Sequence, residues 1–399
     1  MNIPFRTGVN MREFAYYGTP AVPYTSVALQ SAQLNELRGM GVQLVRIFGA
    51  CRRYNATLNA LRLQSALDLI HAAGMQAIIA INDSFNSEYT VPGEQPYHGG
   101  TAGHLHKDYW LYRWYRLYYQ PYVRTVVGAL ANHPAALIWE LGNEFGIHPQ
   151  PPTPSDERAF YNFAVEASAL IKQLAPLSLV STGLVNSNHV TLPRTRAIIA
   201  RRMYALDTID VVSLHFYQDD SEHLTGGLDV QIAKDLGKPF YVGEMGADIG
   251  IGDRAPYYSK TIDDWRKHGA FTVMPWAFDT SPKDVGVSDR KAFARIHGDY
   301  GGIKAALSRN ATAAPRIRPL PPGGKRYRVV LGPLSVRAEP STSARRLNLL
   351  AQGEEIVVET AATGRVEFQG YVWRKHYGKA AWSAEKRTTD GTVYLQEVT

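Results

Sequence analysis

The sequence predicts a (β/α)8 barrel followed by a small all-β domain. Eight short apolar or β-branched runs alternate with eight amphipathic stretches over residues 1–308, and the pattern changes after a Pro-rich segment. Alternating strands and helices are typical of parallel α/β folds, and eight repeats are the count of a closed barrel. The alternative, an open doubly wound sheet, would carry a Gly-rich phosphate loop after its first strand. The turn there, NMREFAYYG, is not such a loop.

Each expected element follows from the local pattern. The strands are expected at about 5–10, 42–48, 75–81, 136–142, 177–183, 209–214, 239–243 and 271–277. The helices are expected near 26–39, 57–73, 106–132, 156–175, 192–206, 222–237, 257–268 and 289–308. Several strands follow a glycine, as in RGMGVQLVRI and HAAGMQAIIA, because glycine just past a helix end adopts the left-handed conformation that stops it.

Residues 309–325 (RNATAAPRIRPLPPGGK) have no apolar period and are rich in Pro, Ala and Gly, which predicts a linker. The barrel domain is therefore expected at 1–308 and the β domain at 326–399. Strands of the β domain are expected at 327–337, 354–360, 366–373 and 392–397. Residues 310–399 hold 14 of the 43 Lys and Arg but only 8 of the 36 Asp and Glu, an excess that can attract anionic polymers.

Composition excludes several classes of protein. Hydrophobic residues make up 45% and charged residues 20%, which excludes wholesale disorder. No apolar run reaches the roughly 18 residues of a membrane span. The single cysteine, Cys51, excludes an intrachain disulfide framework and an all-cysteine metal site. The spacing of His98, His104 and His106 matches no standard metal site, so no metal or other cofactor is expected.

The N-terminus, MNIPFRTGVN, lacks the basic and apolar regions of a signal peptide. Either the protein stays inside the cell or a signal has been removed, and the sequence alone does not decide between these alternatives.

The chemistry is expected at the carboxyl ends of the barrel strands, where barrel enzymes carry their active sites. The fourth strand ends in WELGNEF, which places Asn143 and Glu144 there, and the seventh ends in YVGEMGAD, which places Glu244 there. Strands three βα units apart face each other across the barrel mouth. Two carboxylates in one site, one protonated and one ionised, suit glycoside hydrolysis, with a separation of about 5–5.5 Å in retaining enzymes.

With these residues, the chain from about 5 to 305 resembles a clan A glycoside hydrolase of the family 5 cellulase and mannanase type. The resemblance rests on the Asn-Glu pair that closes the fourth strand and the Glu that closes the seventh. It implies that Glu144 is the acid/base, that Glu244 is the nucleophile and that Asn143 contacts the sugar 2-hydroxyl.

Other residues extend the resemblance. Arg46 in LVRIF would keep Glu244 ionised as a fixed neighbouring cation. In SLHFYQ, His215 would orient the acid/base and Tyr217 would hydrogen-bond the nucleophile. Trp276 in MPWAFD would stack on a sugar ring. Each residue also has an alternative without such a role. Arg46 could lie on the outside of its strand, His215 could be a core histidine, and Trp276 could pack in the core.

The sequence also departs from the family pattern. The third strand ends in INDSFNSEY, where many members carry a histidine, so Asn82, Asp83 or Glu88 is expected to supply polar contacts. Phe145 replaces the common proline after the Asn-Glu pair. The aromatic run at 108–123 is expected on a long helix packed against the barrel, with a sugar-binding platform as the alternative.

The segment LSVRAEPSTSARRLNLLAQGEEIVVE resembles the bacterial SH3-like (SH3b) family. The matching residues are Val336, Arg337, Pro340, Ser341, Gly353, Trp373 and Trp382. Members of that family often bind cell-wall or other extracellular polymers, and a spacer module without a ligand is the alternative.

Together these features predict a retaining endo-β-glycosidase that hydrolyses a polysaccharide, with β-1,4-mannan or β-glucan favoured by the resemblance. The alternatives are a glycosidase acting on a bacterial cell-wall or exopolysaccharide, and a barrel that binds carbohydrate without cleaving it. The expected partners are the polysaccharide and a polymer or cell-wall ligand of the β domain, with no nucleic acid and no membrane span. The resemblance favours a secreted or cell-surface protein.

Overall fold

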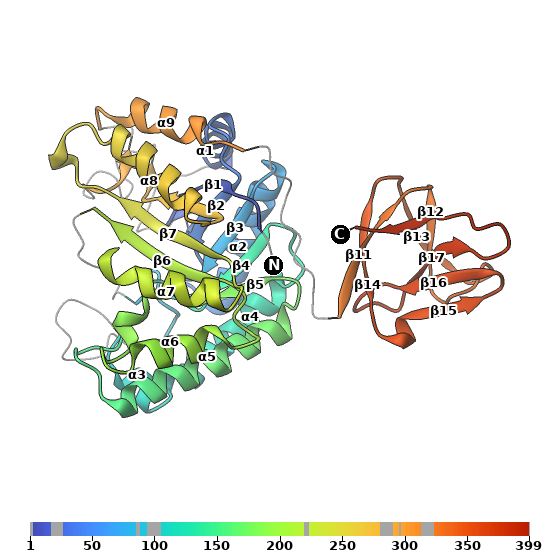
Figure 1. Cartoon of the computed structure of the whole chain (residues 1–399), viewed down its shortest axis with the longest axis horizontal. Helices are drawn as coiled ribbons and strands as arrows, with labels where there is room; N and C mark the ends of the chain where they lie inside the picture. The colour runs from blue at the N-terminus through green and yellow to red at the C-terminus, as the bar shows by residue number, and fades with distance from the viewer. Residues whose placement is uncertain are drawn as a thin grey trace. The chain divides into compact units, whose positions relative to one another are not determined.

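The chain divides into two compact units, Met1–Ile317 and Arg318–Thr399 (Figure 1). The computed structural model describes residues 3–16, 27–84, 88–93, 105–218, 223–279, 290–294, 297–312 and 323–398. Among the helices that these residues form, none has the length and apolar character needed to cross a membrane.

The N-terminal unit is a parallel barrel, which confirms the predicted fold class. Its strands are β1 (Arg6–Asn10), β2 (Leu44–Phe48), β3 (Gln76–Ala80), β4 (Ala136–Glu140), β5 (Leu179–Ser181), β6 (Val212–Tyr217), β7 (Phe240–Gly246) and β8 (Thr272–Pro275). They are hydrogen-bonded in the order β5-β4-β3-β2-β1-β8-β7-β6. A parallel bridge between Ser181 and Val211 joins the two outer strands of this order. Every predicted strand overlaps the observed one, because strands buried on both faces are nearly continuous apolar runs.

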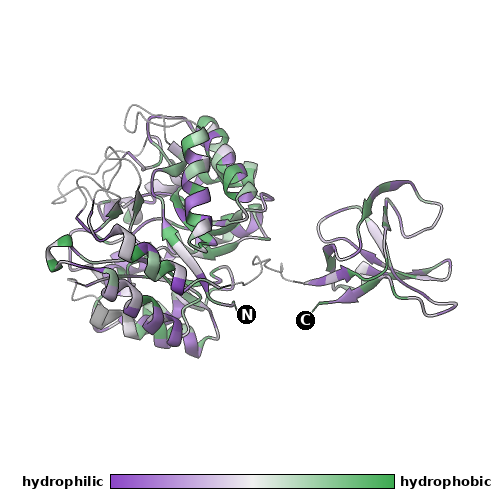
Figure 2. Ribbon diagram, turned by 90° about the horizontal axis from the view of Figure 1, so that it is seen from above, coloured by the Kyte–Doolittle hydropathy of each residue, from purple (hydrophilic) through white to green (hydrophobic). Residues whose placement is uncertain are grey.

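Helices surround the strands (Figure 1). They are α1 (Val27–Gly39), α2 (Ala56–Ala72), α3 (Asp108–Leu111), α4 (Tyr119–Leu130), α5 (Pro154–Leu174), α6 (Arg196–Tyr204), α7 (His223–Asp235), α8 (Ala255–Lys267) and α9 (Tyr300–Arg309). Hydrophobic and hydrophilic residues alternate along them (Figure 2), as expected of helices that pack one face on a sheet. The start of α5 shows the local cause, because Thr153 and Asp156 form a reciprocal capping box.

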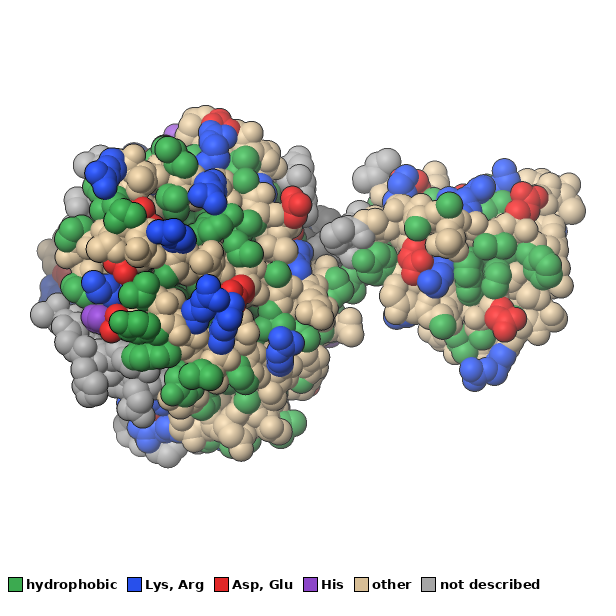
Figure 3. Space-filling model, turned by 90° about the horizontal axis from the view of Figure 1, so that it is seen from below, with side chains coloured by type: hydrophobic (Ala, Val, Ile, Leu, Met, Phe, Trp, Pro, Cys, Tyr) green, Lys and Arg blue, Asp and Glu red, His purple; other side chains and the backbone are tan. Residues whose placement is uncertain are grey.

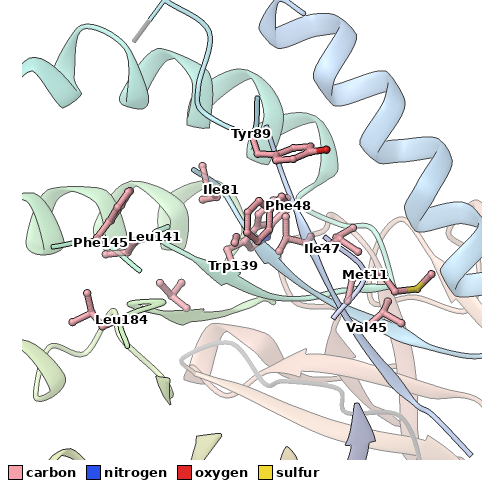
Figure 4. Packing of buried hydrophobic residues seen from close by; sticks show 14 of the residues in the cluster. Met11, Val45, Ile47, Phe48, Ile81, Tyr89, Trp139, Leu141, Phe145 and Leu184 are labelled. Carbon is pink, nitrogen blue, oxygen red and sulfur yellow. The ribbon is translucent and has the colours of Figure 1, made fainter. Parts of the chain in front are cut away.

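Two hydrophobic clusters hold the barrel together. The smaller one contains side chains from several strands, among them Leu44, Ile78, Leu179, Tyr241 and Met274. The larger one joins strands to helices, and Figure 4 shows the part of it around Phe48, Tyr89 and Trp139.

The aromatic run at 108–123 does not form the long helix expected at 106–132. The chain breaks at Arg113, whose φ of 58° is left-handed, so α3 and α4 are separate. The rings of Tyr109, Trp110 and Tyr115 are nevertheless fully buried, as expected of packing against the barrel. The hydroxyl of Tyr119 donates to the carbonyl of Leu141 at 2.8 Å, which ties α4 to the end of β4.

The last predicted helix of the barrel is also shorter than expected. Of the stretch 289–308, residues 293–294 form the short strand β10 (Phe293–Ala294), paired with β9 (Phe278–Asp279), and α9 begins only at Tyr300. The helix ends at Arg309, inside the predicted linker, and most of that linker, residues 313–322, lies outside the described residues.

The C-terminal unit consists of two antiparallel sheets. One contains β11 (Gly324–Val329), β14 (Glu355–Glu359) and β18 (Leu395–Glu397). The other contains β12 (Leu334–Arg337), β13 (Arg346–Leu350), β15 (Arg365–Phe368), β16 (Tyr371–Lys375) and β17 (Trp382–Arg387). Between them lies a small core that includes Val336, Val358 and Trp373. Side chains of both charges and apolar side chains share the face of each unit that Figure 3 shows.

The strand predictions for this unit were partly wrong. The run 327–337 is two strands separated at Gly332-Pro333, and 366–373 is a hairpin whose turn residues, Gln369 and Gly370, both have positive φ. The strands β13 and β17 were not predicted. In β13 four of the five residues are exposed, so the strand carries no alternating apolar pattern.

We expect Trp110→Ala to lower the free energy of unfolding by about 3–5 kcal/mol, because the indole is fully buried among phenylalanines. Its ring centroid lies 5.1 Å from Phe145, 5.0 Å from Phe160 and 4.7 Å from Phe163. Tyr112→Ala is the control, because Tyr112 is 61% exposed and its loss should change stability by about 0.5 kcal/mol or less. Urea denaturation of the full chain measures the free energy of unfolding of both variants. Equal losses of stability in the two variants would contradict the packing of Trp110 described above.

Candidate active site

The side chains singled out in the barrel sequence gather at the carboxyl ends of its strands. Those that the structure brings together are Arg46, Asp83, Asn143, Glu144, His215, Tyr217 and Glu244. The amide of Trp276 donates to the carbonyl of Met245, the residue after Glu244, at 2.8 Å. Strand register contributes to this, because Asn10 lies opposite Arg46 in the β1–β2 pair and His215 opposite Glu244 in the β6–β7 pair.

Arg46 on β2 is completely buried, and its guanidinium contacts side chains from several other strands. Its Nε lies 2.9 Å and its Nη2 2.8 Å from Oε2 of Glu140. Its Nη1 donates to Oδ1 of Asn10 at 3.0 Å and to Oε1 of Glu244 at 2.7 Å. Its Nη2 also donates to Oδ1 of Asn143 at 2.7 Å. One guanidinium therefore holds side chains from β1, β4, the loop after β4, and β7.

Glu140, the last residue of β4, is as fully buried as Arg46. Besides the guanidinium it accepts a hydrogen bond from the hydroxyl of Tyr241 on β7. Burial and the carboxylate of Glu140 raise the pKa of Tyr241 well above its usual range, so this hydroxyl keeps its proton and donates it. Burial by itself lowers the pKa of Arg46, but Glu140 and Glu244 outweigh this effect and raise it.

Glu244 on β7 is 4% exposed and has both carboxylate oxygens engaged. Oε1 contacts Arg46, and Oε2 accepts a hydrogen bond from the hydroxyl of Tyr217 at 2.8 Å. Burial has the largest effect on the pKa of Glu244 and raises it. The charge of His215 lowers this pKa, Glu144 raises it, and Arg46 and Tyr217 lower it, leaving a net pKa above the ordinary glutamate value. The cation expected beside Glu244 is present and lowers the pKa of this carboxyl, but burial outweighs its effect.

Glu144 occupies an unusual backbone conformation in the loop after β4. Its φ is 51°, a left-handed value that costs free energy for a residue with a side chain and tends to occur at functional sites. Its amide donates to the carbonyl of Gly183 at 2.8 Å. Gly183 itself has φ 68°, and a Cβ there would lie 1.8 Å from the carbonyl oxygen of Gly142. The loops after β4 and β5 therefore meet only because residue 183 is a glycine.

Phe145 anchors this loop by burying its ring. The ring centroid lies 5.1 Å from that of Trp110 and 5.6 Å from that of Phe163. The indole nitrogen of Trp110 donates to the carbonyl of Gly146 at 3.1 Å. The aromatic run thus supports the loop that carries Glu144.

His215 on β6 connects the two carboxyl groups. Its Nδ1 lies 2.6 Å from Oε1 of Glu144 and 3.6 Å from Oε2 of Glu244. The ring packs directly on β7, because a Cβ at Gly243 would lie 3.0 Å from Nε2 of His215. The ring therefore has little room to tilt away from the two carboxylates.

One oxygen from each of Glu144 and Glu244, together with one nitrogen of His215, lie within 4.8 Å of one another. Among the described residues these are the His, Cys, Asp and Glu side chains close enough to share an ion. The oxygens of Glu244 are already occupied by the cationic Arg46 and by Tyr217, so we assign the cluster to hydrogen bonding rather than to metal coordination. The short separation of the carboxylates fits the roughly 5–5.5 Å of retaining glycosidases better than the 6.5–9.5 Å of inverting ones.

Asn143 and Asp83 form the polar side of the site near β3. Asn143 accepts from Arg46 and donates from Nδ2 to Oδ1 of Asp83 at 3.0 Å, and both residues are buried. The side-chain Oδ1 of Asn82 accepts from the amide of Val91 at 2.9 Å, and its backbone carbonyl accepts from the amide of Asn143 at 2.6 Å. Asp83 therefore contacts the side chain of Asn143, and Asn82 contacts its backbone.

Glu88 lies apart from the cluster. Its carboxylate pairs with Arg53 and lies 4.0 Å from Arg52, and its side chain is 28% exposed. These contacts tie the segment after β3 to the segment after β2.

Trp276 follows β8 and is 8% exposed. The guanidinium of Arg12 lies 5.8 Å from the centre of its ring and 5.1 Å from the ring of Tyr89. Arg12 also pairs with Glu13 through a contact of 2.6 Å. The tryptophan is therefore bordered by a charged pair that the sequence reasoning did not identify.

Sequence reasoning also missed Asn10, Glu140, Tyr241 and Lys291. A signal existed for two of them, because Asn10 ends the first predicted strand and Glu140 is a charged residue inside the buried run of WELGNEF. A tyrosine in an apolar strand, such as Tyr241, looks like ordinary packing. The ammonium of Lys291 lies 4.4 Å from the centre of the Tyr217 ring, a contact between distant segments that has no local signature.

Comparison with solved structures gives the same fold. The chain is similar to the endo-1,4-beta-D-mannanase of Thermotoga petrophila RKU-1, at 18% identity and a TM-score of 0.60, covering 77% of this chain and 100% of that one. A glycoside hydrolase family 5 mannosidase from Rhizomucor miehei matches at 14% identity, with coverage of 77% and 94% and a TM-score of 0.58. An endoglucanase from Pseudomonas stutzeri matches at 13% identity, with coverage of 80% and 100% and a TM-score of 0.51. No family model and no curated protein sequence matches the chain.

We expect Arg46→Met to destabilise the protein by about 3–5 kcal/mol at pH 7, because it leaves Glu140 and Glu244 buried without their cation. Without the cation the carboxyl of Glu244 should become harder to ionise, so the folded state binds a proton that the unfolded state releases above about pH 4.3. The loss relative to wild type should therefore shrink between pH 7 and pH 5. Urea denaturation of both proteins at pH 7 and at pH 5 measures this loss of unfolding free energy. An equal loss at the two pH values would contradict an effect of charge.

Proposed function

We propose that this protein is a retaining endo-β-glycosidase that hydrolyses a polysaccharide, with Glu144 as acid/base and Glu244 as nucleophile. The observation that carries the proposal is the pairing of two carboxyl groups with different partners at one point of the barrel mouth. Glu244 is held by Arg46 and Tyr217, whereas Glu144 is held by His215. Such an asymmetric pair is what a double displacement at an anomeric carbon requires.

In the first step Glu244 attacks the anomeric carbon, and the bond from that carbon to the leaving oxygen breaks. Glu144 gives its proton to that oxygen, so the leaving sugar departs as a neutral alcohol. Glu244 becomes an ester and Glu144 becomes a carboxylate. The hydrogen bond of 2.6 Å between Nδ1 of His215 and Oε1 of Glu144 would orient Glu144 for this transfer.

In the second step Glu144 takes a proton from water, whose oxygen bonds to the anomeric carbon. The ester bond to Glu244 breaks, and the nucleophile leaves as a carboxylate stabilised by Arg46 and Tyr217. Both carboxyl groups return to their starting states. No cofactor is needed for either step.

Sugar contacts follow from the neighbouring side chains. Asn143 is fixed by Arg46 and Asp83, so that the second N–H of its amide would reach the 2-hydroxyl. The ring of Trp276 would stack on the apolar face of a pyranose. The similarity to a mannanase and an endoglucanase supports β-1,4-mannan or β-glucan as the substrate.

The C-terminal unit, from about residue 326, would be an SH3-like module that binds a polymer. Support comes from its all-β structure and from the basic excess of this part of the chain. That excess also favours a second candidate, in which the enzyme cuts an acidic cell-wall or exopolysaccharide. Release of reducing ends from soluble mannan, glucan and acidic polysaccharides, assayed side by side, separates the two candidates. Binding without release from any of them would favour a barrel that binds carbohydrate without cleaving it.

Leaving-group chemistry tests the two roles separately. On oligosaccharides we expect Glu144→Gln to lower kcat/KM by about 10²–10⁴-fold, the usual contribution of a general acid. On a dinitrophenyl glycoside of the same sugar, whose leaving group needs no proton, the same variant should form the glycosyl-enzyme at nearly the wild-type rate. Glu244→Gln should lose turnover on both substrates. If Glu144→Gln slowed formation of the glycosyl-enzyme equally from the oligosaccharide and from the dinitrophenyl glycoside, the assignment of Glu144 as the general acid would be overturned.

The pH dependence tests the state of the nucleophile. Glu244 must be ionised to attack and its pKa is raised above 4.5, so kcat/KM should fall on the acidic side with a midpoint above pH 4.5. Tyr217→Phe removes a hydrogen bond that favours the carboxylate, so the midpoint should move to higher pH. Initial rates of the wild type and of Tyr217→Phe over a range of pH measure this midpoint. A midpoint that moves to lower pH in the variant would contradict the hydrogen bond from Tyr217 to Glu244.

A further inference from the structure

Arg46 has two buried carboxylate partners, and the proposed reaction uses only one of them. Glu244 accepts from Nη1, whereas Glu140 faces Nε and Nη2 on another edge of the guanidinium. Glu140 and Arg46 are both completely buried, and Glu140 ends β4, three residues before Asn143.

We propose that Glu140 is a positioning residue, the permanent counter-ion that keeps Arg46 neutralised while Glu244 changes from a carboxylate to a sugar ester and back. This inference rests on the proposed function, because it takes Glu244 to be the nucleophile.

The charges show why a second carboxylate is needed. Before the reaction, one guanidinium lies between two carboxylates, with a net charge of −1. In the glycosyl-enzyme Glu244 is an uncharged ester, so Arg46 and Glu140 form a neutral pair. Without Glu140 the intermediate would hold a buried cation with no anionic partner, which costs several kcal/mol. Glu140 thus favours formation of the ester.

The hydrogen bonds show that this counter-ion is held independently of the nucleophile. Tyr241 donates to Oε1 of Glu140, and its raised pKa keeps that donor protonated. Asn10 accepts from Nη1 of Arg46, and its own Nδ2 donates to the carbonyls of Gly243 at 2.8 Å and Met274 at 3.0 Å. The guanidinium therefore keeps its orientation when its contact with Glu244 weakens.

The charged and titratable groups around Glu244 come from several elements. They are Arg46 on β2, Asp83 after β3, Glu140 at the end of β4, Glu144 in the loop after β4, His215 and Tyr217 on β6, Tyr241 on β7, and Lys291, which lies over the Tyr217 ring. Glu140 contacts the guanidinium at Nε and Nη2, whereas Glu244 contacts it at Nη1.

The test is Glu140→Gln, which keeps the shape and removes the charge. With an activated 2-deoxy-2-fluoro glycoside, formation of the trapped intermediate should slow at least about tenfold relative to wild type. Release of the sugar from the trapped enzyme should be unchanged or faster, because an unpaired Arg46 favours the departing carboxylate. The acidic midpoint of kcat/KM should move down by about one pH unit, since the full charge of Arg46 now acts on Glu244.

Two further variants separate charge from stability and shape. Asp229→Asn is the matched control, because Asp229 is equally buried and equally paired, with Arg196 at 2.6 Å and the Tyr204 hydroxyl at 2.6 Å, outside the site. It should lose comparable stability and leave the acidic midpoint in place. Glu140→Asp keeps the charge, so its midpoint should stay within a few tenths of a unit of wild type even if Glu140→Gln does not fold.

The outcomes distinguish this inference from the proposed function. If mass spectrometry of trapped wild type finds the fluorosugar on a residue other than Glu244, the proposed function fails. A second outcome is that the fluorosugar is on Glu244, but Glu140→Gln slows formation of the intermediate and release of the sugar alike and leaves the acidic midpoint of kcat/KM unchanged. In that case only the role of Glu140 fails. A downward midpoint shift in Glu140→Asp would also overturn it, because that variant retains the negative charge.

Discussion

The candidate site depends on one completely buried arginine. A guanidinium removed from water needs a protein partner for its donors, and the partners of Arg46 are acids and amides at the ends of other strands. Satisfying Arg46 therefore brings Asn10, Glu140, Asn143 and Glu244 to one point. The barrel supplies the parallel strands, and this cation determines how their polar ends meet.

A second set of contacts holds the loops from outside the barrel. The ring of Phe145 and the indole of Trp110 fix the loop that carries Glu144, and Gly183 allows the next loop to approach it. The result is a pair of carboxyl groups with opposite surroundings. Glu244 is buried against a cation, whereas Glu144 is more accessible, with a side chain 17% exposed beside His215. Different surroundings for like groups allow one to act as an acid and the other as a nucleophile.

The sequence predicts the barrel well and its details less well. Buried parallel strands and glycine-ended helices leave strong local patterns, so each predicted barrel strand overlaps the observed one. The break at Arg113 leaves no pattern, because any residue can be forced into a left-handed conformation by its surroundings. The edge strand β13 was missed because it is mostly exposed and lacks alternation. Glu140 and Tyr241 were missed because their roles arise from partners about a hundred residues away.

The most direct test of the central claim is the stereochemistry of hydrolysis. Proton NMR can follow the anomeric signals as wild-type enzyme cleaves the β-linked oligosaccharide that it degrades fastest. Carboxyl oxygens within 4.8 Å leave little room for a water between nucleophile and sugar, so the β-anomer should appear first and convert slowly to the equilibrium mixture. Initial release of the α-anomer would show direct attack by water and would contradict the account.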